Sequence, residues 1–271
     1  KMAGIKKRIY TRHHSDLHHT YFPHAVKYDQ IVNNYATHIV AVSGGVKEIL
    51  VQKEQVPEKK VYLIPHGIPV SEMERTSDMD RVSLIREKYG LKESGPIIGV
   101  VSRFTAWKGI QFVIPAFEHL LRQHPKAKLV LANARGDNES EIKKLLSDLP
   151  SHSYVLIPFE NDMRSLFTTF DMFVHVPIDK YCEAFGQVYI EAMNYGVPMV
   201  CTLSGVANEL VVHEKNALVV GYKNSKEIEA ACEHLIKDHS LRAEIVKNAR
   251  TSVEEYSFEK KMQKLLDLYR S

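Results

Sequence analysis

Two short segments of the sequence combine cations, carboxylates and small residues at spacings that suit an anionic, hydroxyl-bearing ligand. In the first segment an apolar run ends at Ser102, Arg103 follows it, and Lys108-Gly109 opens a stretch of helical period. The start of a helix offers unpaired N–H groups, an arginine forks onto two phosphate oxygens, and a lysine adds a point charge. Arg103 and Lys108 can therefore neutralise a diphosphate without a metal ion. The alternative is that both cations are solvated loop residues.

The second segment runs from Glu183 to Glu191. Glu183 precedes a helical pattern, and Glu191 lies about two turns inside it. Ala184 and Gly186 are small enough to let a ligand approach the N–H groups at the helix start. The carboxylates can accept hydrogen bonds from vicinal hydroxyls of a sugar or a ribose. Taken singly, Glu183 is better explained as an acid that stabilises the helix dipole, and Glu191 as an exposed helix residue.

The elements that must position both segments alternate from about residue 96 onward. Short apolar runs separated by stretches of helical period predict βαβ units, and hence an α/β fold with a parallel sheet covered on both faces. The predicted strands are Pro96–Val101, Ala127–Ala132, Tyr154–Ile157, Met172–His175, Pro198–Cys201 and Ala217–Val220. The predicted helices include Ile110–Gln123, Glu139–Leu149, Met163–Phe170 and Gln187–Asn194.

The first 70 residues form a smaller predicted unit. Strands are expected at Arg8–Arg12, His38–Val42 and Val61–Ile64, with a helix at Gly45–Val51. Three strands are too few for a self-sufficient Rossmann-like domain, so we interpret them as part of a lobe whose beginning is absent. The expected division is 1–70 for this lobe, 71–94 for a linker and first helix, 95–256 for the second lobe and 257–271 for a C-terminal helix. The apolar side of that helix is expected to consist of Leu265, Leu266 and Leu268.

Composition limits the function classes further. The 271 residues are 44 % hydrophobic and 25 % charged, which is typical of a globular protein. No run approaches the roughly 18 apolar residues of a membrane span, and no signal peptide is recognisable. The net charge of +3 is too small to indicate nucleic-acid binding. Three cysteines without metal-ligand spacing favour the reducing cytoplasm.

Taken together and in order, the motifs resemble the family 4 retaining glycosyltransferases (glycosyltransferase group 1), which have the two-lobed GT-B fold. The resemblance covers the chain from about Arg8. It implies a Rossmann-like donor-binding domain plus a partial Rossmann-like acceptor domain that lacks its start. The matching motifs are Ile64-Pro65-His66-Gly67-Ile68, the turn from Arg103 to Lys108-Gly109, Glu183 to Glu191, Gly196-Val197-Pro198 and Asn216 to Val220.

The resemblance also implies residue roles. Arg103 and Lys108 would hold the donor diphosphate and stabilise its charge as it leaves. Glu183 would contact donor-sugar hydroxyls, and His13 would face the sugar from the first lobe. These four residues are the implied catalytic set.

The remaining implied roles concern donor binding. Glu191 would bind the nucleotide ribose. The backbone of Ala184, Phe185 and Gly186 would lie beside the sugar and phosphate, and Pro158 and Phe159, followed by Glu160, would line the base pocket.

The function expected from the resemblance is retaining transfer from a nucleotide-diphosphate sugar, with a UDP-sugar favoured. The acceptor is open between a glycan, a lipid-linked molecule and a small molecule, and no cofactor or metal is expected. The leaving phosphate itself is the hypothesised base, because no residue stands out as a covalent nucleophile. The alternatives are a nucleotide-sugar-binding module without activity of its own and, more weakly, a Rossmann dehydrogenase, against which no Gly-x-Gly-x-x-Gly follows a predicted strand.

Several other features remain open. A cluster of histidines could bind a transition metal, but no acid or cysteine completes an obvious ligand set, so a polar loop facing the acceptor is favoured. Its members are His13, His14, His18, His19 and His24. The basic start could touch anionic lipid at the inner membrane face, although a solvated basic surface is favoured. This start comprises Lys1, Lys6, Lys7, Arg8 and Arg12. Asp78-Met79-Asp80 is interpreted as acids at a helix start.

Overall fold

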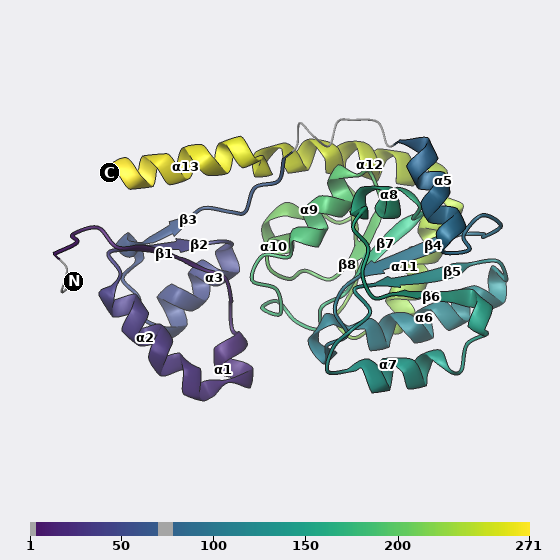
Figure 1. Ribbon diagram of the computed structural model, residues 1–271, viewed down its shortest axis with the longest axis horizontal. Coiled ribbons are helices and arrows are strands. Elements are labelled where there is room, and N and C mark those ends of the chain that lie inside the picture. The colour runs from purple at the N-terminus through teal and green to yellow at the C-terminus, as the bar shows by residue number, and fades with distance from the viewer. Residues whose placement is uncertain (1–3, 70–77) are drawn as a thin grey trace.

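The computed structural model describes residues 4–69 and 78–271, which form two parallel sheets joined by a long C-terminal helical segment (Figure 1). Lys1 and residues 71–77 of the predicted linker lie outside the described residues. Among the residues described, no helix is both long and apolar enough to cross a bilayer.

The larger sheet has six parallel strands in the order β6-β5-β4-β7-β8-β9. Its central strand β4 has all five residues buried, which explains its unbroken apolar sequence. Successive strands wind outward from β4 to one edge, and the chain then returns to the other side of β4 with β7. The bounds are β4 Ile97–Val101, β5 Lys128–Ala132, β6 Tyr154–Ile157, β7 Met172–His175, β8 Met199–Cys201 and β9 Leu218–Val219.

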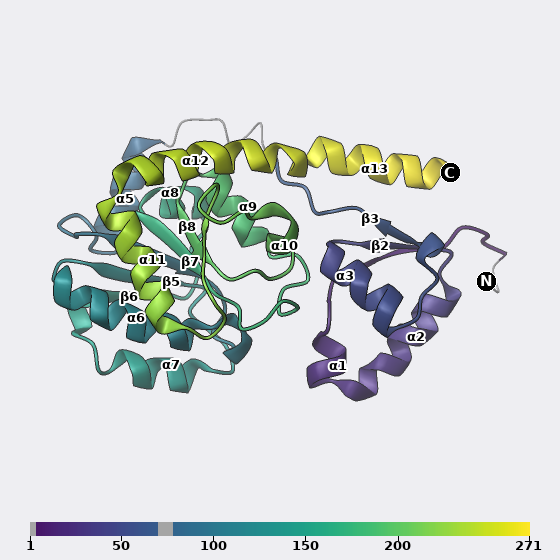
Figure 2. The same cartoon turned by 180° about the vertical axis from the view of Figure 1, so that it is seen from behind.

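Helices cover both faces of this sheet, as the alternating pattern predicts (Figures 1 and 2). One core lies beneath α6 (Ile110–Gln123), α7 (Glu139–Leu146) and α11 (Ser225–Lys237). The other lies beneath α8 (Met163–Thr168), α9 (Gln187–Asn194) and α12 (His239–Val253). The doubly wound α/β fold is confirmed.

The observed bounds agree closely with the predicted ones. β6, β7, α6 and α9 begin and end where the sequence predicts. α7 is shorter than predicted, because a turn in which the Leu149 N–H donates to the Leu146 carbonyl precedes Pro150.

The smaller sheet contains β1 (Ile9–Arg12), β2 (His38–Ala41) and β3 (Val61–Leu63), all parallel. Its helices are α1 (Leu17–Tyr21), α2 (Val26–Tyr35) and α3 (Gly44–Glu48). The helix predicted to end at Val51 instead continues beyond α3 as a π-helical segment, η2 (Ile49–Lys53).

A helix at the start of the larger lobe and a helical segment at the end of the chain complete the fold. α5 (Met79–Lys88) begins at Asp78, whose carboxylate accepts hydrogen bonds from the backbone of Asp80 and Arg81, so Asp78 acts as a helix cap as predicted. After α12, η6 (Glu254–Tyr256) leads into α13 (Phe258–Arg270), which extends over the smaller sheet (Figure 2). Leu268 packs there with Val40 and Ile64.

α13 differs from the prediction in one residue. Leu266 was expected on its apolar side together with Leu265 and Leu268, but it is 40 % exposed because it lies on the outward face of the helix.

Candidate functional site

A cavity of about 330 Å³ lies between the two lobes, at the carboxyl ends of β4 and β7. These adjacent strands flank the point where the strand order reverses, and ligands of open α/β sheets bind at this position. The cavity brings together residues that are 170 positions apart in the chain. Those predicted as site residues and found in its lining are His13, Arg103, Lys108, Glu183, Ala184, Phe185 and Gly186.

Gly109 allows the loop after β4 to pack closely against the backbone just beyond β7. The loop after β4 ends in a short helical turn, η4 (Ala106–Lys108), and Gly109 then takes a left-handed φ of 76° before α6. A Cβ at Gly109 would lie 1.9 Å from the carbonyl oxygen of Val176, just beyond β7. Only glycine therefore fits at this close approach.

Lys108 and Glu183 are ion-paired across the cavity wall. The Lys108 Nζ lies 2.5 Å from Glu183 Oε1, and the same oxygen lies 2.9 Å from His175 Nε2. Burial on its own would raise the pKa of Glu183, but the His175 hydrogen bond and the charge of Lys108 hold that pKa down at about 2. Glu183 is therefore a buried, ionised carboxylate.

His175 was not predicted as a site residue. It is the last residue of β7, 2 % exposed, and in the sequence it is simply one polar residue in an apolar strand. Nothing in its spacing relates it to Glu183, because the contact depends on how the loop after β7 folds back.

The remaining predicted residues lie apart from this cavity. Pro158 and Phe159 follow the edge strand β6 and are exposed, and neither they nor Glu191 are among the described residues that line the cavity. Glu160 is anchored to Lys88 and Tyr89 at 2.7 and 2.6 Å. Glu191 is partly exposed on α9, and burial alone raises its pKa.

His13 contributes to the cavity from the first lobe. Its ring stacks on that of His66 with centroids 5.2 Å apart, and His66 in turn meets the edge of Phe185 from the second lobe at 5.0 Å. Burial, together with the nearby charge of Lys261 and of His13, lowers the pKa of His66 to about 4. His66 is thus neutral at pH 7 and serves as an aromatic bridge between the lobes.

Polar contacts close the lobes around the cavity. The Ser43 hydroxyl donates to the carbonyl of Ala184 at 2.6 Å, beside the cavity itself. Glu48 accepts hydrogen bonds from Lys180 and from the Tyr181 hydroxyl at 2.6 and 2.7 Å. The loop after β7 is therefore held by both lobes.

The histidine cluster is completed by an acid, contrary to the prediction. Asp29, on α2, lies 3.3 Å from His14 Nε2 and 2.6 Å from His18 Nδ1, a grouping of side chains that could ligate a metal ion. Arg12, however, already contacts both oxygens of Asp29 at 3.2 Å and also Glu54 at 2.5 Å. A bound cation would have to compete with this resident guanidinium, so we assign the cluster the role of fixing the loop that carries His13.

The same geometry corrects the interpretation of the basic start. Arg12 is buried, and the Arg8 side chain donates to backbone carbonyls, including that of Tyr35 at 2.7 Å. Lys7 donates to the carbonyl of Leu268 at 3.2 Å. These cations support the first lobe and are not all presented as a surface patch.

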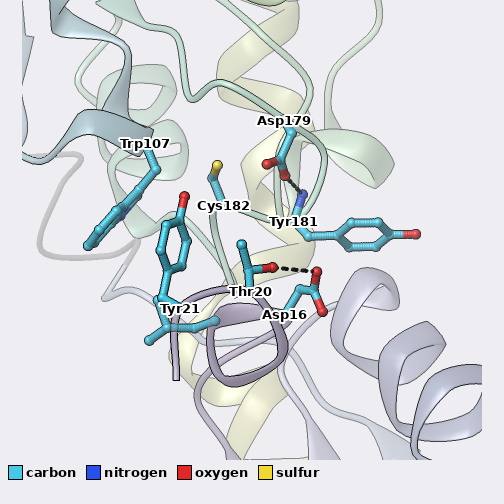
Figure 3. Close-up of a pocket in the computed structure, with 8 residues that line it drawn as sticks. Asp16, Thr20, Tyr21, Trp107, Asp179, Tyr181 and Cys182 are labelled. Carbon is cyan, nitrogen blue, oxygen red and sulfur yellow. Dashed lines mark hydrogen bonds between the residues drawn. The ribbon is translucent and has the colours of Figure 1, made fainter. Parts of the chain in front are cut away.

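A second, smaller cavity adjoins the first where α1 faces the other lobe (Figure 3). The Tyr21 ring from α1 lies beside the indole of Trp107, with centroids 5.0 Å apart. Cys182 lines both cavities. Burial and the nearby Asp179 raise the pKa of its thiol to about 12, so the thiol is protonated and a poor nucleophile.

Comparison with known proteins relates the chain to a family and a fold. A family model described as glycosyl transferases group 1 matches residues 82–252. An uncharacterized glycosyltransferase of Methanocaldococcus jannaschii is 30 % identical over 252 residues, which cover 91 % of this chain and 63 % of the relative. The capsular polysaccharide biosynthesis glycosyltransferase CapM of Staphylococcus aureus is 28 % identical, over 81 % of this chain and 57 % of CapM. The chain thus spans about three fifths of the length of these relatives.

Solved structures share the fold. HepE of Anabaena, in complex with UDP-glucose, superposes with a TM-score of 0.86 at 22 % identity, over 98 % of this chain and 72 % of HepE. A sucrose-phosphate synthase of Thermosynechococcus elongatus superposes with a TM-score of 0.80 at 20 % identity, over 97 % of this chain and 67 % of the synthase.

Proposed function

The chain belongs to the group 1 glycosyltransferase family and has the GT-B fold, and from this premise we propose that it transfers a sugar from a nucleotide-diphosphate sugar to an acceptor with retention of anomeric configuration. A UDP-sugar is the proposed donor. HepE, which shares the fold, has been solved with UDP-glucose, and this supports the choice.

The observation that carries the proposal is the convergence of two cations, a carboxylate and a helix start in one cavity. Arg103 and Lys108 come from the loop after β4, and Glu183 and Gly186 from the loop after β7. Gly186 has a left-handed φ of 83° and caps α9, so the free N–H groups of that helix are available at the cavity. A diphosphate and a sugar need this combination of positive potential and hydroxyl acceptors.

The proposed mechanism stabilises the leaving group. As the glycosidic bond breaks, negative charge grows on the diphosphate, and the donors already fixed around it lower the barrier. In the free protein Lys108 is ion-paired with Glu183. Donor binding replaces this pair by two new contacts: Lys108 binds the diphosphate, and Glu183 accepts hydrogen bonds from the sugar hydroxyls. The departing phosphate oxygen accepts the proton of the acceptor hydroxyl, which then bonds to the sugar on the same face.

We expect this chemistry to need no divalent metal, because the guanidinium of Arg103 and the ammonium of Lys108 offer the diphosphate two positive charges. Excess EDTA should leave both UDP affinity and turnover unchanged. Turnover that EDTA abolishes and magnesium restores would contradict this part of the proposal.

Calorimetry with UDP tests the site directly. The double variant R103A/K108A should lose at least about a hundredfold in UDP affinity, because two charge-assisted contacts disappear. The matched control R122A/K126A removes two cations on and just after α6 that lie outside the cavity lining, and it should bind UDP like the parent. Equal affinity in the first variant would remove Arg103 and Lys108 from the site.

The second candidate function is a nucleotide-sugar-binding module without turnover. It is favoured by the observation that the chain spans only part of its relatives' length. Incubation of the chain with UDP-sugars and simple sugar acceptors separates the two functions, because a module binds UDP yet releases no UDP from UDP-sugar.

A further inference from the structure

His175 is placed to control the carboxylate of Glu183 from behind the cavity. It does not line the cavity, and its imidazole is packed between two aromatic rings, that of Phe173 with centroids at 6.0 Å and that of Tyr189 at 4.8 Å. Its Nε2 lies 2.9 Å from Glu183 Oε1. The contact therefore joins the end of β7 to the loop that carries Glu183.

The protonation states fix the direction of this hydrogen bond. Glu183 is ionised, and burial lowers the pKa of His175, so the imidazole is neutral. A carboxylate only accepts, so the Nε2–H donates and the proton is absent from Nδ1. Among the described residues, His175 Nδ1 has no hydrogen-bond partner, which agrees with this tautomer.

The two hydrogen-bond donors to Glu183 Oε1, Lys108 and His175, differ in their freedom to move when a ligand binds. Lys108 borders the cavity and has a flexible side chain, so it can turn toward a bound phosphate. The His175 ring is enclosed by Phe173 and Tyr189 and cannot turn toward a bound phosphate as Lys108 can. The Tyr189 hydroxyl is already committed to the carbonyl of Thr202 at 3.0 Å, so it cannot replace either donor.

We propose that His175 is a positioning residue, whose hydrogen bond holds the Glu183 carboxylate toward the donor sugar after Lys108 has turned to the diphosphate. This inference rests on the proposed function for its consequence, but the hydrogen bond can be tested without any ligand. Without His175, the exchange of Lys108 would leave a buried carboxylate with neither of its side-chain partners, and such a group takes up a proton or changes its position.

The variants must separate hydrogen bonding from packing. H175F keeps an aromatic ring between Phe173 and Tyr189 but has no N–H, whereas H175Q offers an amide N–H in a side chain of similar reach. K108M removes the ammonium and imitates the state in which Lys108 has left Glu183. Thermal unfolding of each variant shows whether the fold is retained.

The first experiment follows the ionisation of Glu183 in the ligand-free protein by carbon-13 NMR of labelled glutamate carboxyls. The Glu183 signal is assigned by its loss in E183Q. The charged and titratable groups around this carboxyl are Lys108 and His175, which contact it, and Tyr189, and Arg103 also lines the cavity. In K108M/H175F, Glu183 should titrate at least about one pH unit higher than in K108M, and K108M/H175Q should match K108M. Identical titration of Glu183 in all three variants would overturn the inference, irrespective of whether the protein binds UDP.

The second experiment measures UDP affinity and the release of UDP from UDP-glucose. H175F should bind UDP within about threefold of the parent, because UDP alone lacks the sugar, while kcat falls about ten- to a hundredfold. H175Q should recover most of kcat. Equal losses of UDP affinity and kcat, unrelieved in H175Q, would mean that His175 only supports the fold. A parent that binds no UDP would exclude the proposed UDP-sugar donor, and the NMR titration would still decide the role of His175.

Discussion

The opposite charges of Lys108 and Glu183 compensate each other in the free protein. Both side chains are largely buried, with 16 % and 10 % of their surfaces exposed, so each charge would be costly without the other. A diphosphate with an attached sugar can satisfy both at once, whereas a simple anion satisfies only Lys108. Under the proposed function, the pair should therefore favour the intact donor over its phosphate fragment.

Replacement of Glu183 tests this selectivity. E183Q should keep UDP affinity within a few-fold of the parent, since the nucleotide has no sugar hydroxyls for the carboxylate. Transfer from UDP-sugar should fall at least about a hundredfold, because a buried acceptor of sugar hydrogen bonds is lost. Calorimetry and a UDP-release assay measure the two effects. A parallel fall of both quantities would assign Glu183 to the nucleotide or to the fold.

Glu191 gives a prediction for pH. Burial raises its pKa in the free protein, and a ribose that donates hydrogen bonds to the carboxylate favours the ionised form. UDP should therefore bind with full affinity at pH values above this raised pKa. Its affinity should decrease as the pH falls through the pKa and Glu191 becomes protonated. E191Q should bind UDP more weakly at neutral pH and should lack this acid decrease. Calorimetry at a series of pH values checks both; an unchanged acid decrease in E191Q would exclude Glu191 from the ribose site.

Some residue partnerships were beyond sequence reasoning. The pattern indicated Arg103, Lys108 and Glu183 because each follows or precedes a recognisable element. His175 and Asp29 gave no such signal, since each matters through a side chain brought to it by a loop or by another helix. Arg12 was interpreted as a surface cation, yet its partners are buried carboxylates 17 and 42 positions away.

At the scale of elements, the site depends on two loops that follow neighbouring strands. The sequence predicted these strands well because β4 and β7 are short, largely apolar runs that directly follow Pro96 and Asp171. It did not predict that they are adjacent, since their pairing joins Ile98 to Met172 although two strands, β5 and β6, and the helices α6, α7 and α8 lie between them in the chain. The loop conformations also depend on backbone contacts such as that of Gly109 with Val176, which no periodicity records.

Two glycines with similar backbone angles test the importance of this close approach. G109A places a methyl group against the Val176 carbonyl, whereas G90A, at a left-handed φ of 65°, meets open space. G90A should cost about 1 kcal/mol for the conformation alone. G109A should cost at least about 2 kcal/mol more and should also weaken UDP binding, because it displaces the loop that carries Lys108. Urea unfolding and calorimetry make the comparison; equal losses of stability would show that this loop shifts freely.

At the scale of the whole molecule, the two lobes are held together by contacts of different kinds. One kind is a side-chain hydrogen bond between the lobes, such as that from Lys180 to Glu48. The C-terminal segment is more permanent, because Ile68 exchanges backbone hydrogen bonds with Tyr256 and Phe258, and α13 then packs on the smaller sheet. Movement of the lobes should therefore pivot near Ile68.

Leu268 tests how far the first lobe depends on α13. L268A removes a buried side chain that contacts β2 and the end of β3, and it should cost about 2–4 kcal/mol. L266A, two residues earlier on the outward face, should change stability by less than about 0.5 kcal/mol. Hydrogen exchange should show faster exchange in β2 in the first variant while β4 and β5 stay protected. Equal exchange of β2 in both variants would mean that the smaller sheet stands without this helix.

The cover that α13 provides also has a consequence for biosynthesis. Leu63, at the end of β3, and Phe258, at the start of α13, are 195 positions apart in the chain. At roughly 5–20 residues per second, a ribosome needs about 10–40 s to produce the residues between them. During that interval the apolar face formed by Val40 and Ile64 has no partner from α13. A chaperone that binds nascent chains would be expected to bind this apolar face. The strands that form it are translated early, and the helix that covers it is translated much later.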